Sequence, residues 1–358
     1  MKFMKSRGGL AKSGSAAGQQ LSHLGNHPYV AAAAVGVAAL AISALVNRRG
    51  TKTAERLNPP KGKFLEIDGV QLHYVERGKG EPLVLLHGNG SMIQDFESSG
   101  LLDKAAKKHR VIVFDRPGYG HSPRPRGTVW SPEAQADLIH DALKQLDATP
   151  AIVLGHSWGA SVAVALAMKF ETSVKALVLA SGYYYPTARV DVAAASMPAM
   201  PILGDIFRYT LAPLLGRIMW PYLMRKIFGP AEMPNKFTKG FPVGLALRPS
   251  QIRASAAESG LMIPDAFALR DKYGDLKMPV VIIAGDLDRL IDTEGQSARL
   301  HRDVAHSTFH SVPGAGHMVH QTAMVEVMAA IDEAAAARGL TRSAFLSSAA
   351  RDKIRAEG

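Results

Sequence analysis

Gly155-His156-Ser157-Trp158-Gly159 is the stretch that decides the fold of this chain. It follows an apolar run at 151–154 and precedes a run of small residues at 160–167, a pattern that predicts a strand, a sharp turn and a helix. A serine at the apex of such a turn has a strained backbone, so its neighbours must be small, and Gly155 and Gly159 meet that need. The turn would lift the Ser157 hydroxyl out of the sheet, beside the N-terminus of the helix.

Partners for this serine are expected further along the chain, because a hydroxyl needs a base and the base needs an orienting acid. Residues 279–285 form a buried-strand pattern that runs into Asp286 and Asp288. Another strand pattern, at 308–312, is followed closely by His317. Each candidate follows the C-terminal end of a predicted strand, which is where open α/β sheets place their sites.

Five motifs in a fixed order give the chain a resemblance to the α/β-hydrolase family over roughly residues 64–338. They are His87-Gly88-Asn89-Gly90, the run from Asp115 to Ser122, the serine turn, Gly285-Asp286-Leu287-Asp288 and Gly314-Ala315-Gly316-His317. By that resemblance Ser157 is the nucleophile, His317 the general base and acid, and Asp288 the residue that orients the imidazole. Asn89 and Trp158 would form the oxyanion hole through their backbone N–H groups. The resemblance implies no cofactor, and no metal-ligand motif such as H-E-x-x-H is present.

Neighbouring residues compete for these roles. Asp286 is the alternative acid, and His310 and His320 are the alternative bases. Four other polar residues are interpreted as structural: His87 and His156, which could also line a pocket, Asp115, which would brace the turn after its strand, and Asp95, a surface or helix-start residue. The predicted substrate pocket contains His87, Tyr183, Tyr184 and Met318.

A serine nucleophile favours acyl transfer, in which an ester or similar carbonyl forms an acyl-enzyme that water then releases. The related haloalkane dehalogenases and epoxide hydrolases carry an aspartate at this position, so Ser157 argues against both activities. We therefore expect a serine hydrolase of a small to medium hydrophobic ester. A cofactor-free haloperoxidase (perhydrolase) and a carbon–carbon bond hydrolase are alternatives, as is a catalytically idle binding protein on the same fold.

Composition sets outer limits on these hypotheses. The chain has 358 residues, of which 47% are hydrophobic, enough for one large domain with an insertion. It has no cysteine, which excludes disulfides and thiolate zinc sites. Of the net charge of +11, residues 1–63 contribute +9 from ten basic side chains and one acid, leaving +2 for the rest. We expect no nucleic-acid partner, because no basic stripe lies in the folded part; the sequence does not indicate an oligomeric state.

Residues 29–46 are uncharged and rich in alanine and valine. As a helix they would be about 27 Å long, close to the roughly 30 Å of a bilayer core, so we predict a transmembrane helix. A cleaved signal peptide and a soluble or interfacial helix are the alternatives. Basic residues cluster after the span and only Lys12 lies near it on the other side, which predicts a single pass through the inner membrane with a cytoplasmic catalytic domain. Residues 1–28 would be a disordered basic leader and 47–62 a basic linker.

The rest of the chain predicts a mostly parallel eight-stranded sheet with helices on both faces, begun by a hairpin through Asp68-Gly69. The hydrolase core would be residues 63–182 and 273–338, with a helical cap at 183–272 inserted after the sixth strand and a tail at 339–358. Helical periodicity predicts that most large apolar residues of the cap pack inward, and its methionines suit a flexible hydrophobic pocket. These residues are Met197, Met200, Ile202, Leu203, Ile206, Phe207, Leu211, Leu214, Leu215, Ile218, Met219, Trp220, Leu223, Met224, Ile227 and Phe228.

Overall fold

The computed structural model describes residues 28–337, which contain an eight-stranded sheet in the order β1-β2-β4-β3-β5-β6-β7-β8. The strands are β1 (Lys63–Ile67), β2 (Val70–Arg77), β3 (Glu81–Leu86), β4 (His109–Phe114), β5 (Ala151–His156), β6 (Val174–Ala180), β7 (Val280–Gly285) and β8 (Ser307–Val312). β1 and β2 form the predicted antiparallel hairpin, β2 runs antiparallel to β4, and all other pairs are parallel. The predicted fold class is confirmed.

Helices cover both faces of the sheet, because the central strands are apolar on both sides. On β5, Ala151 and Val153 pack towards α5 (Pro132–Gln145) and α6 (Trp158–Lys169). Ile152 and Leu154 pack on the opposite face, with α3 (Ile93–Ser99), α4 (Leu101–Ala105) and α15 (Met324–Ala336). All six residues of β5 are buried, so the strand that carries the serine turn is held firmly between the two helix layers.

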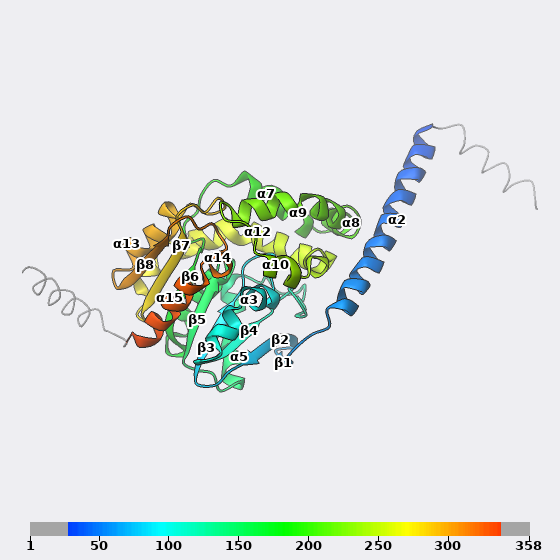
Figure 1. Cartoon of the computed structure of the whole chain (residues 1–358). Helices are drawn as coiled ribbons and strands as arrows, with labels where there is room; N and C mark the ends of the chain where they lie inside the picture. The colour runs from blue at the N-terminus through cyan, green and yellow to red at the C-terminus, as the bar shows by residue number, and fades with distance from the viewer. Residues whose placement is uncertain (1–27, 338–358) are drawn as a thin grey trace, which may run out of the picture.

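Helices α7 to α12 separate β6 from β7 and gather at one end of the sheet, green to yellow in Figure 1. They are α7 (Val190–Ser196), α8 (Leu203–Thr210), α9 (Ala212–Phe228), α10 (Asn235–Gly240), α11 (Val243–Ala246) and α12 (Pro249–Leu269). The short helices α13 (Arg299–Asp303) and α14 (Val319–Thr322) flank β8. We call α7–α12 the cap helices.

One part of the cap prediction is wrong. Of the sixteen large apolar cap residues expected to pack inward, ten are exposed: Met200, Ile202, Leu203, Ile206, Leu211, Leu214, Leu215, Ile218, Met219 and Leu223. The reason is geometric, because α8 and α9 lie on the side of the cap away from the sheet, where part of each helix surface faces outward.

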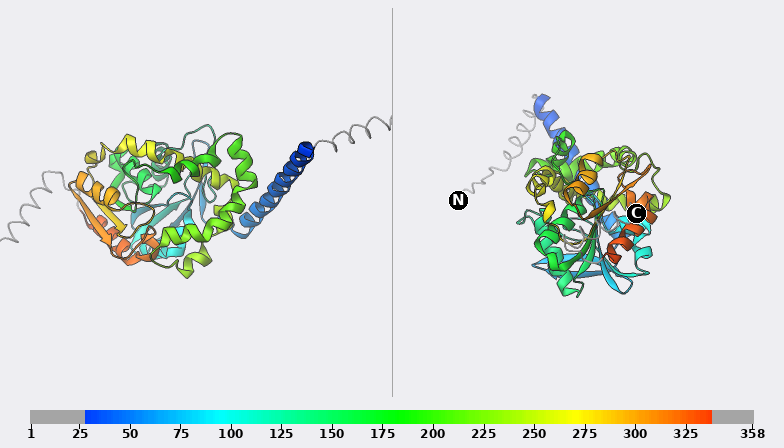
Figure 2. Two further views of the ribbon diagram at one scale, coloured as in Figure 1. Left: turned by 90° about the horizontal axis from the view of Figure 1, so that it is seen from above. Right: turned by 90° about the vertical axis from the view of Figure 1, so that its left-hand side faces the viewer.

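The N-terminal helix α2 (Pro28–Leu57) is long and projects from the domain, blue in Figures 1 and 2. Its apolar part has a mean hydropathy of 2.3 over 18 residues, none of them buried. The helix continues through most of the expected linker at 47–62, so that boundary was wrong. Residues 47–57 are mainly good helix formers, and the helix ends only where Asn58 precedes two prolines. The predicted leader before residue 28 and the tail at 339–358 lie outside the described residues.

Candidate active site

Ser157 lies between the end of β5 and the start of α6 with a positive φ of 53°, the strained conformation that the turn motif predicts. A Cβ at Gly155 would collide with the Gly159 carbonyl oxygen, and one at Gly159 would collide with the Leu86 carbonyl oxygen. Both glycines are therefore required for the close approach of α6 to β5 and β3. The Ser157 N–H donates to the Ala180 carbonyl at 2.9 Å, which ties the turn to the end of β6.

His317 and Asp288 form a buried hydrogen-bonded pair. The His317 Nδ1–H donates to Asp288 Oδ2 at 2.7 Å, and the two side chains are 2% and 1% exposed. Asp288 Oδ1 accepts from the backbone N–H groups of Leu290 and Ile291 at 2.8 and 3.0 Å. Burial acts to raise the pKa of Asp288, but His317 and these hydrogen bonds outweigh it and lower the pKa below its usual value. Asp288 is thus a carboxylate at neutral pH.

The alternative residues lie elsewhere. Asp286 Oδ1 accepts from the Gly314 N–H at 2.7 Å and is exposed, so it holds a turn and does not contact His317. His310 is exposed on β8 and pairs with Glu333 at 2.7 Å. His320 is fully buried and pairs with Asp95. Among these candidates, only Asp288 and His317 share a hydrogen bond, and His317 lines the same cavity as Ser157.

Ser157 and His317 both line a cavity of about 580 Å³ between the strand ends and the cap helices. Within the described chain no hydrogen bond joins Ser157 Oγ to the His317 ring, and such bonds often tighten only with substrate present. His317 is held from both sides. Its N–H donates to the Ile227 carbonyl of α9 at 3.1 Å, and its carbonyl accepts from His156 Nε2 at 3.1 Å.

The predicted pocket residues divide into two pairs. Tyr183 and Met318 line the cavity, whereas His87 and Tyr184 do not. Both His87 nitrogens are taken, since Nε2 accepts from the Arg116 N–H and Nδ1 donates to the Gly88 carbonyl. Burial, followed by the nearby Arg116 charge, lowers the pKa of His87 to about 4, so it is neutral. Tyr184 is packed in the core, with its ring edge against a neighbouring tyrosine ring. His87 and Tyr184 were thus wrongly predicted to line the pocket, because residues distant in the sequence surround them in the structure.

Asn89 and Trp158 also line this cavity, one in the loop after β3 and one at the first position of α6. Their backbone N–H groups make no hydrogen bond with any described residue, as expected for donors kept for a ligand. The Asn89 side chain faces the cap, where its amide donates to the Ser255 carbonyl at 3.1 Å. Gly88 allows the loop to approach closely, because a Cβ there would lie 3.0 Å from Ser157 Cβ.

A fully buried ion pair between Arg116 and Glu258 fixes this loop, and sequence reasoning missed it. Arg116 follows β4, donates through Nε to the His87 carbonyl at 2.8 Å and through Nη2 to the Gly88 carbonyl at 3.0 Å. Glu258 comes from cap helix α12, and its two oxygens accept from the guanidinium at 2.5 and 3.0 Å. Burial opposes the ionised form of Glu258, but Arg116 outweighs it and lowers the Glu258 pKa. The cap therefore holds the loop that carries Asn89.

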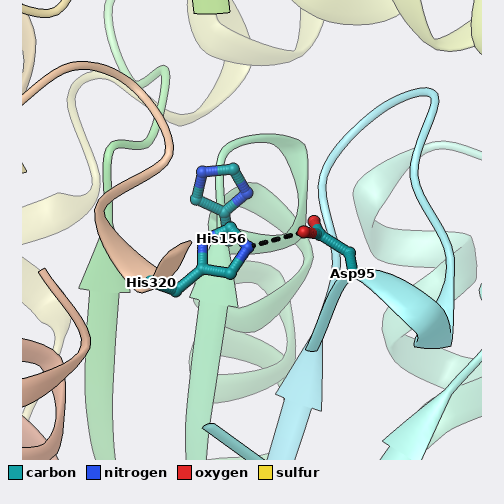
Figure 3. Close-up of side chains that lie close together, drawn as sticks. All are labelled: Asp95, His156 and His320. Atoms are coloured by element: carbon teal, nitrogen blue, oxygen red, sulfur yellow. Dashed lines mark hydrogen bonds and ion pairs between the residues drawn. The ribbon is translucent and has the colours of Figure 1, made fainter. Parts of the chain in front are cut away.

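Asp95, His156 and His320 form a second buried cluster beside the serine turn (Figure 3). Asp95 lies in the first turn of α3, as predicted, but it is buried and not at the surface. It accepts from His320 Nε2 at 2.9 Å and from Gln321 Nε2 at 2.7 Å. Burial and the charges of its histidine neighbours depress the pKa of His156. The candidate ligand atoms of the three residues lie within 4.8 Å of one another, but the Asp95–His320 hydrogen bond already pairs two of them.

A sequence model of the α/β-hydrolase fold matches residues 81–323, more than half of the chain. The chain belongs to the α/β-hydrolase fold family. One curated relative, 2-hydroxymuconate semialdehyde hydrolase of Pseudomonas sp. (strain CF600), is 29% identical over 163 residues, 44% of this chain and 58% of that protein, less than two thirds of its length. Another, 2-(acetamidomethylene)succinate hydrolase of Mesorhizobium japonicum, is 28% identical and aligns over 72% of this chain and 88% of its own length.

Solved structures agree on the fold. A thermophilic esterase from Thermogutta terrifontis has a TM-score of 0.61 at 22% identity, covering 76% of this chain and 95% of its own. A bacterial membrane phospholipase A has a TM-score of 0.59 at 18% identity and covers 89% of this chain and all of its own. Other curated relatives include haloalkane dehalogenases and a putative non-heme chloroperoxidase, so membership of the family does not fix the bond that is cleaved.

Proposed function

We propose that the protein is a serine hydrolase of small to medium hydrophobic esters, held at a membrane by α2. The observation that carries this proposal is the 2.7 Å hydrogen bond from His317 to the buried Asp288, beside a cavity that also exposes Ser157 on its strained turn. An aspartate nucleophile is absent from this turn, which argues against dehalogenase chemistry despite the dehalogenase relatives.

In the first half of the reaction, Ser157 Oγ attacks the ester carbonyl and its proton passes to His317 Nε2. The imidazolium that forms is stabilised by Asp288, whose carboxylate already accepts from Nδ1. The carbonyl oxygen becomes an oxyanion and accepts from the N–H groups of Asn89 and Trp158. When the tetrahedral intermediate collapses, the C–O bond breaks and His317 gives its proton to the leaving alcohol.

In the second half, water attacks the acyl-enzyme and gives a proton to His317, and collapse returns that proton to Ser157 while the acid leaves. The cavity suits an apolar acyl group. Its cap wall includes Met219, Trp220, Leu223 and Phe241, and largely apolar walls with a few directed polar groups are typical of small-molecule sites.

A carbon–carbon bond hydrolase is the second candidate, favoured by the similarity to 2-hydroxymuconate semialdehyde hydrolase. A perhydrolase uses the same triad and would need only a different acyl acceptor. Both activities predict a reactive Ser157, so substrate profiling separates them from ester hydrolysis.

Membrane attachment rests on the length and composition of α2, whose apolar window contains no buried residue. The charges after the span favour a cytoplasmic catalytic domain. A topology reporter fused after Gly358 tests this orientation, and a strong extracytoplasmic signal would reverse it.

The decisive experiment is hydrolysis of p-nitrophenyl esters from acetyl to long acyl chains by the full-length protein in detergent. We expect Ser157→Ala to lose activity by about 10⁴-fold or more. Ser161→Ala is the matched control, because Ser161 lies one turn further along α6 and donates only to the Tyr183 carbonyl. Activity that survives in Ser157→Ala would contradict the proposal. If the wild type cleaves no ester while a fluorophosphonate still labels Ser157, then Ser157 is a reactive nucleophile but esters are not its substrates.

A further inference from the structure

Large apolar residues are exposed on two neighbouring cap helices, α8 and α9. On α9, Leu214, Ile218 and Tyr222 follow one another at a spacing of four residues and are 53%, 67% and 60% exposed. Side chains at this spacing lie on one helix face. On α8, Leu203 and Ile206 are 64% and 51% exposed. We call these five residues the cap apolar face. Clustered exposed apolar side chains are typical of surfaces that contact a partner or a membrane.

Helix α2 fixes where this face lies. Ser43 Oγ donates to the Thr210 carbonyl at the end of α8 at 2.7 Å, and Asn47 Nδ2 donates to the same carbonyl at 2.6 Å. From Pro28 to Asn47 the helix rises roughly 28 Å, which is close to the roughly 30 Å thickness of a bilayer core. If α2 spans the membrane as proposed, Asn47 lies where the helix leaves the hydrocarbon, and its hydrogen bond attaches the end of α8 there. Figures 1 and 2 show α8 beside α2.

The charges near this level fit a bilayer surface. Arg48, Arg49 and Lys52 are exposed on α2 just beyond the apolar part. Arg217 and Arg225 are exposed on α9, among the apolar residues. Basic side chains at the edge of an apolar face are attracted to anionic lipid headgroups. The combination favours a membrane over a second protein as the partner of this face.

The same helix reaches the candidate active site. Met219, Tyr222 and Leu223 of α9 are exposed and also line the cavity that contains Ser157. The Ile227 carbonyl of α9 accepts from the His317 N–H. The wall of the cavity and the exposed face thus lie on the same helix and share Tyr222, so apolar side chains of α9 run from the surface to the cavity.

We propose that the cap apolar face inserts into the membrane leaflet beside α2, and that acyl-chain esters enter the cavity directly from the bilayer. This inference rests on the proposed ester hydrolysis and membrane attachment, and it names the substrate class as lipid-soluble esters. Binding would use apolar contacts of α8 and α9 in addition to the span of α2.

The absence of cysteine allows a direct test, because each introduced cysteine takes a single label. Ile218→Cys carries a fluorophore on the cap apolar face, and Val325→Cys is the matched control, since Val325 is 69% exposed on α15. Full-length protein is reconstituted in phosphatidylcholine–phosphatidylglycerol vesicles that contain lipids with a nitroxide on the acyl chain. We expect at least a twofold quenching at position 218 and none at 325. Equal quenching at the two positions would overturn the proposal. It would also be overturned if the label at position 218 were shielded from water by a second copy of the protein and not quenched by the lipid nitroxide.

Leu45→Cys separates this inference from membrane attachment itself, because Leu45 lies within the apolar part of α2. Quenching at position 45 without quenching at 218 would refute only the docking of the cap. No quenching at either position would refute the anchor as well.

An activity measurement completes the test. The double variant Leu214→Asp, Ile218→Asp should cleave a long-chain ester embedded in vesicles at least tenfold more slowly. Its cleavage of a water-soluble short-chain ester should be unchanged, because neither residue lines the cavity. Equal losses on both substrates would contradict entry from the bilayer. A wild type inactive on both esters would contradict ester hydrolysis and leave the quenching result standing.

A second cavity supports an independent inference. It has a volume of about 510 Å³, lies between the end of α2, α8 and the start of α12, and includes none of the candidate catalytic residues. Five arginines line it: Arg124, Arg126, Arg208, Arg248 and Arg253. The acids against them are fewer: Glu55 pairs with Arg248, Asp205 with both Arg126 and Arg208, and Glu258 with Arg124. Arg253 makes no hydrogen bond within the described chain. Burial, then the charges of Arg126 and Arg124, lowers the pKa of Arg253.

We infer that this arginine cavity binds a phosphate-type anion, either free or as a lipid headgroup. Bidentate guanidinium contacts are the usual means of holding phosphate. The test measures the melting temperature of full-length protein in phosphatidylcholine nanodiscs, with added inorganic phosphate in one arm and added phosphatidylglycerol in the other. A rise in either arm that Arg253→Gln loses, and that Arg302→Gln on exposed α13 retains, supports the site and names its source. No rise in either arm, or a rise that both variants retain, overturns it.

Discussion

Strand β5 and helix α9 are both rich in large apolar residues, yet their surroundings are opposite. Every residue of β5 is buried between two layers of helices. On α9, only Ala212, Pro213, Met224 and Phe228 are buried, and most of its large apolar side chains are exposed. The comparison teaches that apolar sequence in this chain serves two purposes. In the core it drives packing, and in the cap it forms a surface that also walls the cavity.

The largest expected effect is on the reaction rate, and it comes from removing the buried negative charge of Asp288 in the core. Asp288→Asn should lower kcat by about 10⁴-fold, because an amide cannot hold the His317 tautomer or stabilise its imidazolium. Steady-state hydrolysis of the best p-nitrophenyl ester measures the change. Asp286→Asn is the matched control two residues away, since its carboxylate holds only the Gly314 turn. A large loss in Asp286→Asn with normal activity in Asp288→Asn would exchange the two assignments.

The next largest effect concerns the ion pair between Glu258 of the cap and Arg116 of the core, which links the two regions. Removing one partner of a buried pair leaves an uncompensated charge, so Glu258→Gln should cost about 3–5 kcal/mol of unfolding free energy. Urea unfolding followed by tryptophan fluorescence measures it. Glu333→Gln removes a more exposed partner, that of His310, and should cost less than about 1 kcal/mol. Similar costs for the two variants would mean that the cap does not brace the core.

A pair of leucines tests the comparison directly. Leu154 on β5 is fully buried and Leu214 on α9 is 53% exposed. Leu154→Ala should cost about 2–5 kcal/mol, because it removes buried methyl groups and leaves a cavity. Leu214→Ala should change stability in detergent by no more than about 0.5 kcal/mol. Urea midpoints of the full-length variants measure both. A costly Leu214→Ala would mean that the cap apolar face packs against protein.

The sequence predicted what depends on local pattern. The eight strands and the serine turn follow from apolar runs and from glycines at fixed offsets, which constrain the backbone wherever they occur. The choice of Asp288 and His317 over their neighbours came from the resemblance to the family, and the structure shows a hydrogen bond between these two residues. The Arg116–Glu258 pair joins residues 142 positions apart and has no local signature. The same holds for Asp95, which meets His320 across 225 positions. Helical periodicity predicted that the large apolar residues of α9 pack inward, but it cannot tell whether protein or membrane covers them, since both satisfy the same pattern.

The smallest expected effect concerns Asp265 on α12, where burial, followed by the charges of Glu133 and Glu258, raises the pKa to about 7. A raised carboxyl pKa means that the fold prefers the protonated form. The wild type therefore loses stability as the pH rises from about 4 towards 7, and the penalty is complete above 7. Asp265→Asn removes this titration. Because Asp265 is only partly buried, the gain should be on the order of 1 kcal/mol at pH 8 and near zero at pH 4. Urea midpoints across this pH range measure the difference, with Asp271→Asn as the exposed control. If Asp265→Asn changed the stability equally at pH 4 and pH 8, ionisation of Asp265 would not destabilise the fold. The cap helix would then tolerate a carboxylate at this position as readily as the protein surface does.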